Sequence, residues 1–305
     1  MRHSHSSSEN HSHHHNIRNK KALGLAFTII TIYMIIEAIG GITTKSLALL
    51  SDAGHMLSDS AALGLSYLAM KFGGKEPTFT KTFGYRRFEI LAAFLNGITL
   101  LVISLFIFFE AYKRFTNPPE VISSGMLIIA SIGLIVNIIV ALILMKGDRK
   151  DNLNIRSAFL HVLGDMLGSI GAIIAALLIM FFGWNLADPI ASIIVAVLII
   201  ISGWRVTRDS FHVLMEGTPT NIDVRQIKES LLTLDQVENV HDLHVWSITS
   251  GFPALSCHLT IHPKGDRDQI LLQANQLLRD QFHIEHTTIQ MDRSDSTCIE
   301  KDHCN

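Results

Sequence analysis

Six long apolar segments, separated by short polar loops, fill the chain between Ala22 and Arg208. Each is close to the roughly 20 residues that an α-helix needs to cross the hydrocarbon core of a bilayer. In lipid the backbone polar groups must be satisfied within the span, and these continuous runs lack the period-2 alternation of barrel strands, so helices are predicted. We expect them at Ala22–Thr43, Leu47–Phe72, Phe88–Tyr112, Val121–Met145, Ser157–Phe182 and Ala187–Val206.

Lysine and arginine are distributed unevenly between the loops. The loops after the second and fourth segments carry nine of these residues, and the loops after the first, third and fifth carry three. Basic residues favour the cytoplasmic side of a membrane. The sequence therefore predicts that both termini are cytoplasmic.

Composition excludes several other classes of protein. The chain has 25 Lys+Arg against 27 Asp+Glu, a net charge of −2, so no basic excess favours a nucleic-acid partner. Three cysteines in 305 residues exclude a disulfide scaffold. The polar first twenty residues do not resemble a cleavable signal peptide, and no G-x-x-x-x-G-K-[ST] loop indicates ATP-driven pumping.

Residues 209–292 have the composition of a small soluble domain. Apolar residues at helical spacing predict a helix over Asn221–Leu234. Strands are predicted at Val237–Thr249 and Ala254–His262, a second helix at Asp266–Phe282 and a last strand at Thr287–Met291. The order αββαβ predicts a ferredoxin-like α+β domain after a six-helix transmembrane bundle at 22–208.

Both ends of the chain are polar and lack periodicity. Residues 1–21 contain six histidines among Ser, Asn and Glu, so we expect a disordered cytosolic tail that either collects metal weakly or is neutral low complexity. Residues 293–305 are expected to form a flexible tail. Cys298, His303 and Cys304 in that tail fit a soft zinc site; alternatively, the two cysteines are free thiols.

The pattern S-x-x-x-H-x-L-x-D occurs twice, once in the second apolar segment and once in the fifth. One copy ends in His55 and Asp59, and the other, 106 residues later, ends in His161 and Asp165. Residues four apart lie on one face of a helix. If the two helices face each other, they offer two imidazoles and two carboxylates to one ion.

Two nitrogen and two oxygen ligands suit tetrahedral Zn²⁺, and the lack of thiolate permits release of the ion. Ionisable groups inside a membrane are costly and indicate function. A His–Asp hydrogen bond that only holds two helices together is the alternative, but it does not explain the duplication. Because histidine titrates near neutral pH, protons compete with metal for these ligands, and an exchange of metal for protons is our hypothesis.

The sequence resembles the cation diffusion facilitator family, most closely its zinc-exporting bacterial members. The matching stretches are Ser46–Ser66, Phe83–Asn96, Asn154–Gly171, Ala187–Val197, Val240–Gly251 and Thr287–Asp292. The resemblance implies a homodimer in the inner membrane, metal/proton antiport, and His55, Asp59, His161 and Asp165 as the transport site. It also implies that His rather than Asp at position 55 favours zinc over cadmium.

The same resemblance implies a zinc site in the cytosolic domain. The matching positions are His241, His258 and Asp292, with Gln290 where some relatives have a histidine ligand. The loop Gly73–Arg87 contains no His or Asp, so the ligand cluster that some relatives carry there is expected to be absent. We assign His244, His262, His283 and His286 to ordinary solvated or packing positions, and Cys257 to the core.

These observations favour a secondary transporter, not an enzyme, that exports Zn²⁺ from the cytosol in exchange for protons and provides zinc homeostasis and resistance. The same transport of Cd²⁺, Co²⁺, Ni²⁺ or Mn²⁺ is the first alternative. A membrane-anchored zinc sensor is the second. A membrane metalloenzyme is disfavoured because the sequence has no H-E-x-x-H helix.

Overall fold

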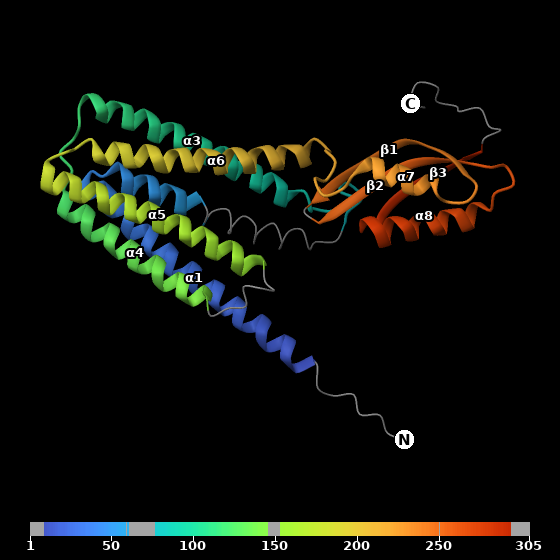
Figure 1. The fold of residues 1–305 in the computed structure, drawn as a ribbon, viewed down its shortest axis with the longest axis horizontal. Helices are drawn as coiled ribbons and strands as arrows, with labels where there is room; N and C mark the ends of the chain where they lie inside the picture. Colours follow the sequence, from blue (N-terminus) through green and yellow to red (C-terminus); the bar gives the residue numbers. More distant parts are fainter. Residues whose placement is uncertain (1–8, 59, 61–76, 146–152, 250, 294–305) are drawn as a thin grey trace, which may run out of the picture. The chain divides into compact units, whose positions relative to one another are not determined.

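The computed structural model describes residues 9–58, 60, 77–145, 153–249 and 251–293 (Figure 1). The chain forms two compact units, one made of residues 1–64 and 96–205 and the other of residues 65–95 and 206–305. The first unit contains most of the apolar helical residues, and the second contains the β-sheet.

Apolar helices occupy the predicted places. Their bounds are α1 Glu9–Thr44, α3 Phe88–Thr116, α4 Ser123–Met145, α5 Leu153–Phe182 and α6 Ala187–Leu214. Within the described residues these five are long and apolar enough to cross a membrane. Residues 47–58 are also helical and begin the second predicted span, whose residues 61–72 lie outside the described part of the chain.

Helix α1 begins earlier than its apolar segment. Residues 9–21, for which composition predicts disorder, are helical and continuous with the membrane span. Once a helix has nucleated, each added residue gains a backbone hydrogen bond without a second nucleation cost. The long apolar part of α1 therefore supplies the nucleus for a polar extension that has too few apolar residues to fold alone.

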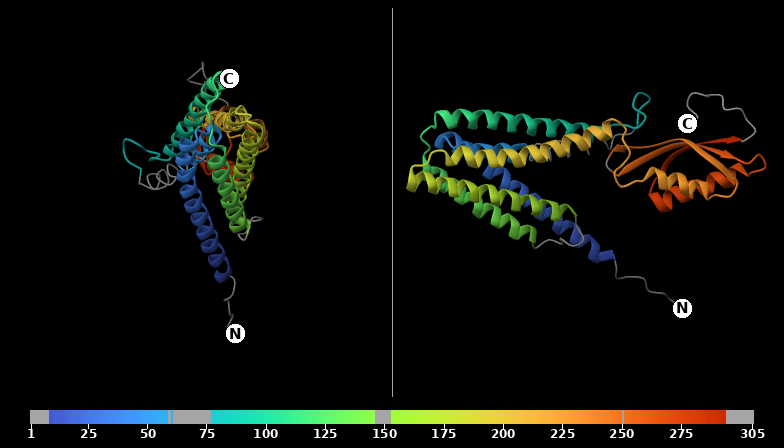
Figure 2. Two further views of the ribbon diagram at one scale, coloured as in Figure 1. Left: turned by 90° about the vertical axis from the view of Figure 1, so that its left-hand side faces the viewer. Right: turned by 45° about the horizontal axis from the view of Figure 1, so that its top comes forward.

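Within the first unit, α4 contacts both α1 and α5 (Figure 2). The contact with α5 is built from small side chains, since Ala172, Ala175 and Ala176 are all buried there. Small residues let helix backbones approach closely in lipid, where association depends on packing and hydrogen bonds. Asn137 on α4 donates such a hydrogen bond to Ser169 on α5, at 3.5 Å.

The outer surface of this unit exposes large aromatic side chains, while several polar side chains are buried inside it. Phe106, Phe181 and Phe182 are 65%, 73% and 78% exposed, whereas Asn96, Asn137 and Ser169 are buried. A water-soluble unit would bury the large aromatic side chains and expose the polar ones. The observed distribution fits a bundle surrounded by lipid.

The carboxylate of Asp188, at the start of α6, is fully buried and holds the start of the helix at residues 47–58. It accepts hydrogen bonds from Ser46 Oγ at 2.6 Å, Leu47 N at 2.8 Å and Ala48 N at 3.1 Å. Arg114 Nη1 lies 3.4 Å from the same carboxylate. Asp188 thus satisfies amide groups that a helix leaves unpaired at its start, although they belong to a different helix.

The second unit contains the α+β domain in the predicted order. Its elements are α7 Val224–Leu232, β1 Val237–Thr249, β2 Phe252–Ile261, α8 Arg267–Phe282 and β3 His286–Arg293. The sheet order is β1-β2-β3. Strands β1 and β2 are antiparallel, whereas β2 and β3 are parallel because α8 connects them.

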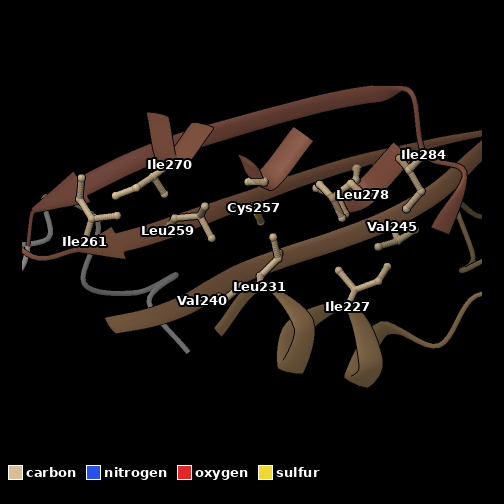
Figure 3. Packing of buried hydrophobic residues seen from close by; sticks show 12 residues of the cluster. Ile227, Leu231, Val240, Val245, Cys257, Leu259, Ile261, Ile270, Leu278 and Ile284 are labelled. Atoms are coloured by element: carbon tan, nitrogen blue, oxygen red, sulfur yellow. The ribbon is translucent and has the colours of Figure 1, made fainter. Parts of the chain in front are cut away.

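One apolar core joins both helices to one face of this sheet (Figure 3). Alternate residues of β2 face it, and Leu255, Cys257, Leu259 and Ile261 are all buried, as the sequence predicts. His258 lies between two of these positions, so its side chain points to the other face of the sheet.

We expect Leu231→Ala to lower the free energy of unfolding of the α+β domain by about 2–5 kcal/mol, because Leu231 is fully buried in this core. Its neighbour Leu232 is 40% exposed, so Leu232→Ala is the matched control and is expected to change stability by less than about 0.5 kcal/mol. Hydrogen exchange of residues 224–293 in the detergent-solubilised full chain measures both. Equal effects of the two variants would contradict this packing.

Candidate metal sites

Half of the membrane ligand set predicted from the duplicated pattern lies in the described side chains. His55 is half-buried on the helix at residues 47–58, and Asp165 on α5 is 3% exposed. Asp59 lies outside the described residues. For His161 only the helical backbone of α5 is described.

The two helices that carry the pattern approach each other closely. A Cβ atom placed on Gly168 of α5 would lie 3.3 Å from Asp52 Oδ1 and 3.5 Å from its other carboxylate oxygen. Asp52 lies three residues before His55, and Gly168 lies three residues after Asp165. His55 therefore lies about one turn from this contact along its own helix, and Asp165 lies about one turn from it along α5.

A buried acidic group of α1 extends this polar region. Glu37 is 1% exposed, and its Oε1 accepts a hydrogen bond from Tyr33 at 3.0 Å. Asp52 and Asp165 are also buried and lie near enough to interact electrostatically with Glu37. The interior of the bundle therefore gathers buried acidic groups beside the predicted metal ligands.

The second predicted ligand set is assembled on the three strands of the sheet. His241 on β1 is directly opposite His258 on β2, with ring centroids 5.0 Å apart. Asp292 comes from β3, which pairs with β2 in parallel. Among the described residues these three form the one group whose nitrogen and carboxylate ligand atoms all lie within 4.8 Å of one another.

The donor atoms are already close to the spacing of a zinc site. Asp292 Oδ2 lies 3.2 Å from His258 Nδ1 and 3.5 Å from His241 Nε2. Tetrahedral Zn²⁺ with bonds of about 2.0–2.1 Å separates neighbouring ligand atoms by roughly 3.3 Å. The chain thus presents three of four tetrahedral positions, and the fourth is left for water or a group from another molecule.

Gln290 supports this arrangement from the same face of β3. Its Nε2 donates to Asp292 Oδ1 at 3.1 Å. The other oxygen, Oδ2, is the one that faces both imidazoles. Gln290 therefore orients the carboxylate in this chain.

Two further residues belong to this region: Asp242, which the sequence analysis did not single out, and His244, which it assigned to an ordinary solvated or packing position. Asp242 lies 3.6 Å from His258 Nε2 and 2.8 Å from His244 Nε2, and the His244 side chain is exposed. In the sequence, the only sign of these contacts is the run His241-Asp242-Leu243-His244, and that run has the pattern of an ordinary strand. The tail group Cys298, His303 and Cys304, like the loop residues 73–76, lies outside the described residues.

The apolar helices and the duplicated ligand pattern are those of a multi-pass membrane transporter. Residues 23–215 match the family model described as "Cation efflux transmembrane domain", and residues 219–294 match "Cation efflux protein, cytoplasmic domain". The chain belongs to the cation efflux family, the cation diffusion facilitators.

Relatives extend over nearly the whole chain. The "Cadmium, cobalt and zinc/H(+)-K(+) antiporter" of Bacillus subtilis (strain 168) is 56% identical, covering 92% of this chain and 91% of that protein. "Zinc transporter ZitB" of Escherichia coli (strain K12) is 44% identical, covering 96% and 93%. A solved structure, the metal-bound C-terminal domain of the CzcD transporter, is 32% identical over 23% of this chain and 99% of that one, with a TM-score of 0.22.

Cys257 is a thiol in the same α+β domain, but its side chain faces the core. Burial raises its pKa to about 12, so at pH 8 only about 10⁻⁴ of the thiol is ionised. In a C298S/C304S variant, we expect Cys257 to resist iodoacetamide in the native chain and to react in guanidinium chloride. Mass spectrometry of the alkylated chain measures this, and rapid labelling of the native chain would contradict it.

Proposed function

We propose that this protein exports Zn²⁺ from the cytosol across the inner membrane in exchange for protons and so provides zinc homeostasis and resistance. The approach of the two motif-bearing helices at Asp52 and Gly168 is the observation that carries the proposal. It brings His55 and Asp165 within about one helical turn of a common contact. Relatives named as a zinc transporter and as an antiporter support zinc as the transported ion and exchange with protons as the coupling.

In this proposal His55, Asp59, His161 and Asp165 bind the transported ion. Zinc needs the imidazoles neutral and the carboxylates ionised, so binding displaces protons from these groups. The buried acidic groups Glu37 and Asp52, which lie near Asp165, support a route by which protons pass the same region. A helix movement that opens the site to each side in turn then exchanges metal for protons.

His241, His258 and Asp292 form, in this proposal, a cytosolic Zn²⁺ site separate from the cargo site. The spacing of their donor atoms supports it, and ligands from three strands make it sensitive to the packing of the domain. We place residues 22–208 in the membrane and 209–292 in a cytosolic dimerisation domain of a homodimer, with both termini in the cytosol. Cys298, His303 and Cys304 remain a predicted metal-binding tail.

We expect Asp165→Asn to abolish Zn²⁺ uptake into inside-out vesicles, because it removes a charged ligand from a buried site while keeping the size of the side chain. Glu120→Gln, which neutralises an exposed carboxylate, is the control and should transport normally. Parallel assays with Cd²⁺ and Co²⁺ test the metals named for the relative. Uptake of the Asp165→Asn variant at the wild-type rate, or uptake indifferent to a pH gradient, would contradict the proposal.

We expect Asp292→Ala to weaken zinc binding to the cytosolic domain and to raise the zinc concentration needed for half-maximal transport. Loss of a direct ligand should exceed the roughly 10- to 100-fold effect that removal of an outer partner has. Asp280→Ala on the exposed face of α8 is the control, with unchanged binding. Equilibrium competition with a zinc chelator gives the affinity, and an activation curve that does not move would limit the site to a structural role.

A further inference from the structure

A β-bulge interrupts β1 within the cytosolic ligand set. His241 pairs with His258 and His244 pairs with Ser256, so three steps along β1 match two steps along β2. The extra residue is accommodated at Asp242, whose φ is +49°. Asp and Asn adopt this left-handed conformation more readily than other residues with a Cβ atom. Bulges redirect side chains and are frequent next to functional sites.

The bulge brings the Asp242 carboxylate between two imidazoles. Its Oδ2 lies 3.6 Å from His258 Nε2, and its Oδ1 lies 2.8 Å from His244 Nε2. On a regular strand, residues 241 and 242 would point to opposite faces. Here both are half-buried and both contact His258, because the left-handed residue breaks the alternation.

The two nitrogens of His258 therefore face different carboxylates. Nδ1 lies 3.2 Å from Asp292 Oδ2, inside the ligand set, whereas Nε2 faces Asp242 on the other edge of the ring. A metal-bound histidine usually donates its second ring N–H to a carboxylate or carbonyl, which fixes the tautomer and strengthens the ligand.

We propose that Asp242 is a positioning residue of the cytosolic metal site: when an ion binds Nδ1 of His258, the Asp242 carboxylate closes from 3.6 Å to hydrogen-bond distance and accepts the Nε2–H, while His244 holds the carboxylate from outside. The inference rests on the proposed zinc site at His241, His258 and Asp292. Asp242 and His244 do not touch the ion in this arrangement, because an ion on Nδ1 lies beyond reach across the ring. Their function is to set the orientation and basicity of one ligand.

Two substitutions separate this role from a role in the backbone. Glycine and asparagine both tolerate a positive φ, so Asp242→Gly and Asp242→Asn keep the bulge while removing the charge. The full-length chain in detergent, with Asp165→Asn in every sample to weaken the cargo site, is titrated with Zn²⁺ against a chelator. We expect Asp242→Gly to weaken binding roughly 10- to 100-fold and Asp242→Asn, which keeps an acceptor oxygen, to weaken it less.

A second measurement follows the hydrogen bond itself. In the Co²⁺-loaded chain, the Nε2–H of His258 should give a hyperfine-shifted proton signal that exchanges slowly with water, and Asp242→Gly should remove or accelerate that signal. Hydrogen exchange of residues 237–261 checks that the strands remain paired. Wild-type zinc affinity and an unchanged proton signal in both variants would overturn the proposal for Asp242. If Asp292→Ala also bound zinc like the wild type, the cytosolic site itself would be refuted.

Discussion

The buried carboxylate of Asp188 holds together the part of the membrane bundle on which the proposed transport depends. It replaces water for the first amide groups of the helix that carries His55, and Arg114 lies beside it to balance the charge. Unpaired amides and an unpaired carboxylate would each be costly in lipid. Because the cap joins the start of α6 to the start of a different helix, it fixes where the helix at residues 47–58 begins. From that fixed start, His55 and Asp52 reach the level of Asp165 and Gly168 on α5.

The two candidate metal sites differ in a way that suits different tasks. The membrane groups lie among other buried acids, Glu37 and Asp52, so in the proposed cycle metal and protons compete for one region. The cytosolic donors lie on one face of a well-packed sheet, at distances close to those of a bound ion. A transported ion must leave its site, whereas a resident ion benefits from ligands that are oriented before it arrives. Gln290 and Asp242 supply such orientation for Asp292 and His258.

Periodicity and length alone predicted most of the fold. The apolar helices and the αββαβ order follow from long apolar runs and from the alternation at Leu255, Cys257, Leu259 and Ile261, because burial fixes those patterns directly. The sequence did not predict the features that depend on contacts between distant residues. Asp188 caps the start of a different helix, and the bulge at Asp242 is decided by strand register, so neither role follows from the local sequence. Residues 9–21 were expected to be disordered because of their polar composition. They are helical because they extend the apolar helix that follows them, and composition alone does not show this dependence.

The three candidate ligands of the cytosolic domain come one from each strand, so an ion bound to them would hold β1, β2 and β3 together. An ion that binds only the folded domain adds RT ln(1 + [L]/Kd) to its stability, about 2.7 kcal/mol at a hundredfold excess over Kd. Cellular proteases act on the unfolded population, and this gain in stability lowers that population about a hundredfold. The lifetime of the transporter would then lengthen when zinc is abundant and shorten when it is scarce, which matches its abundance to demand without any change in gene expression.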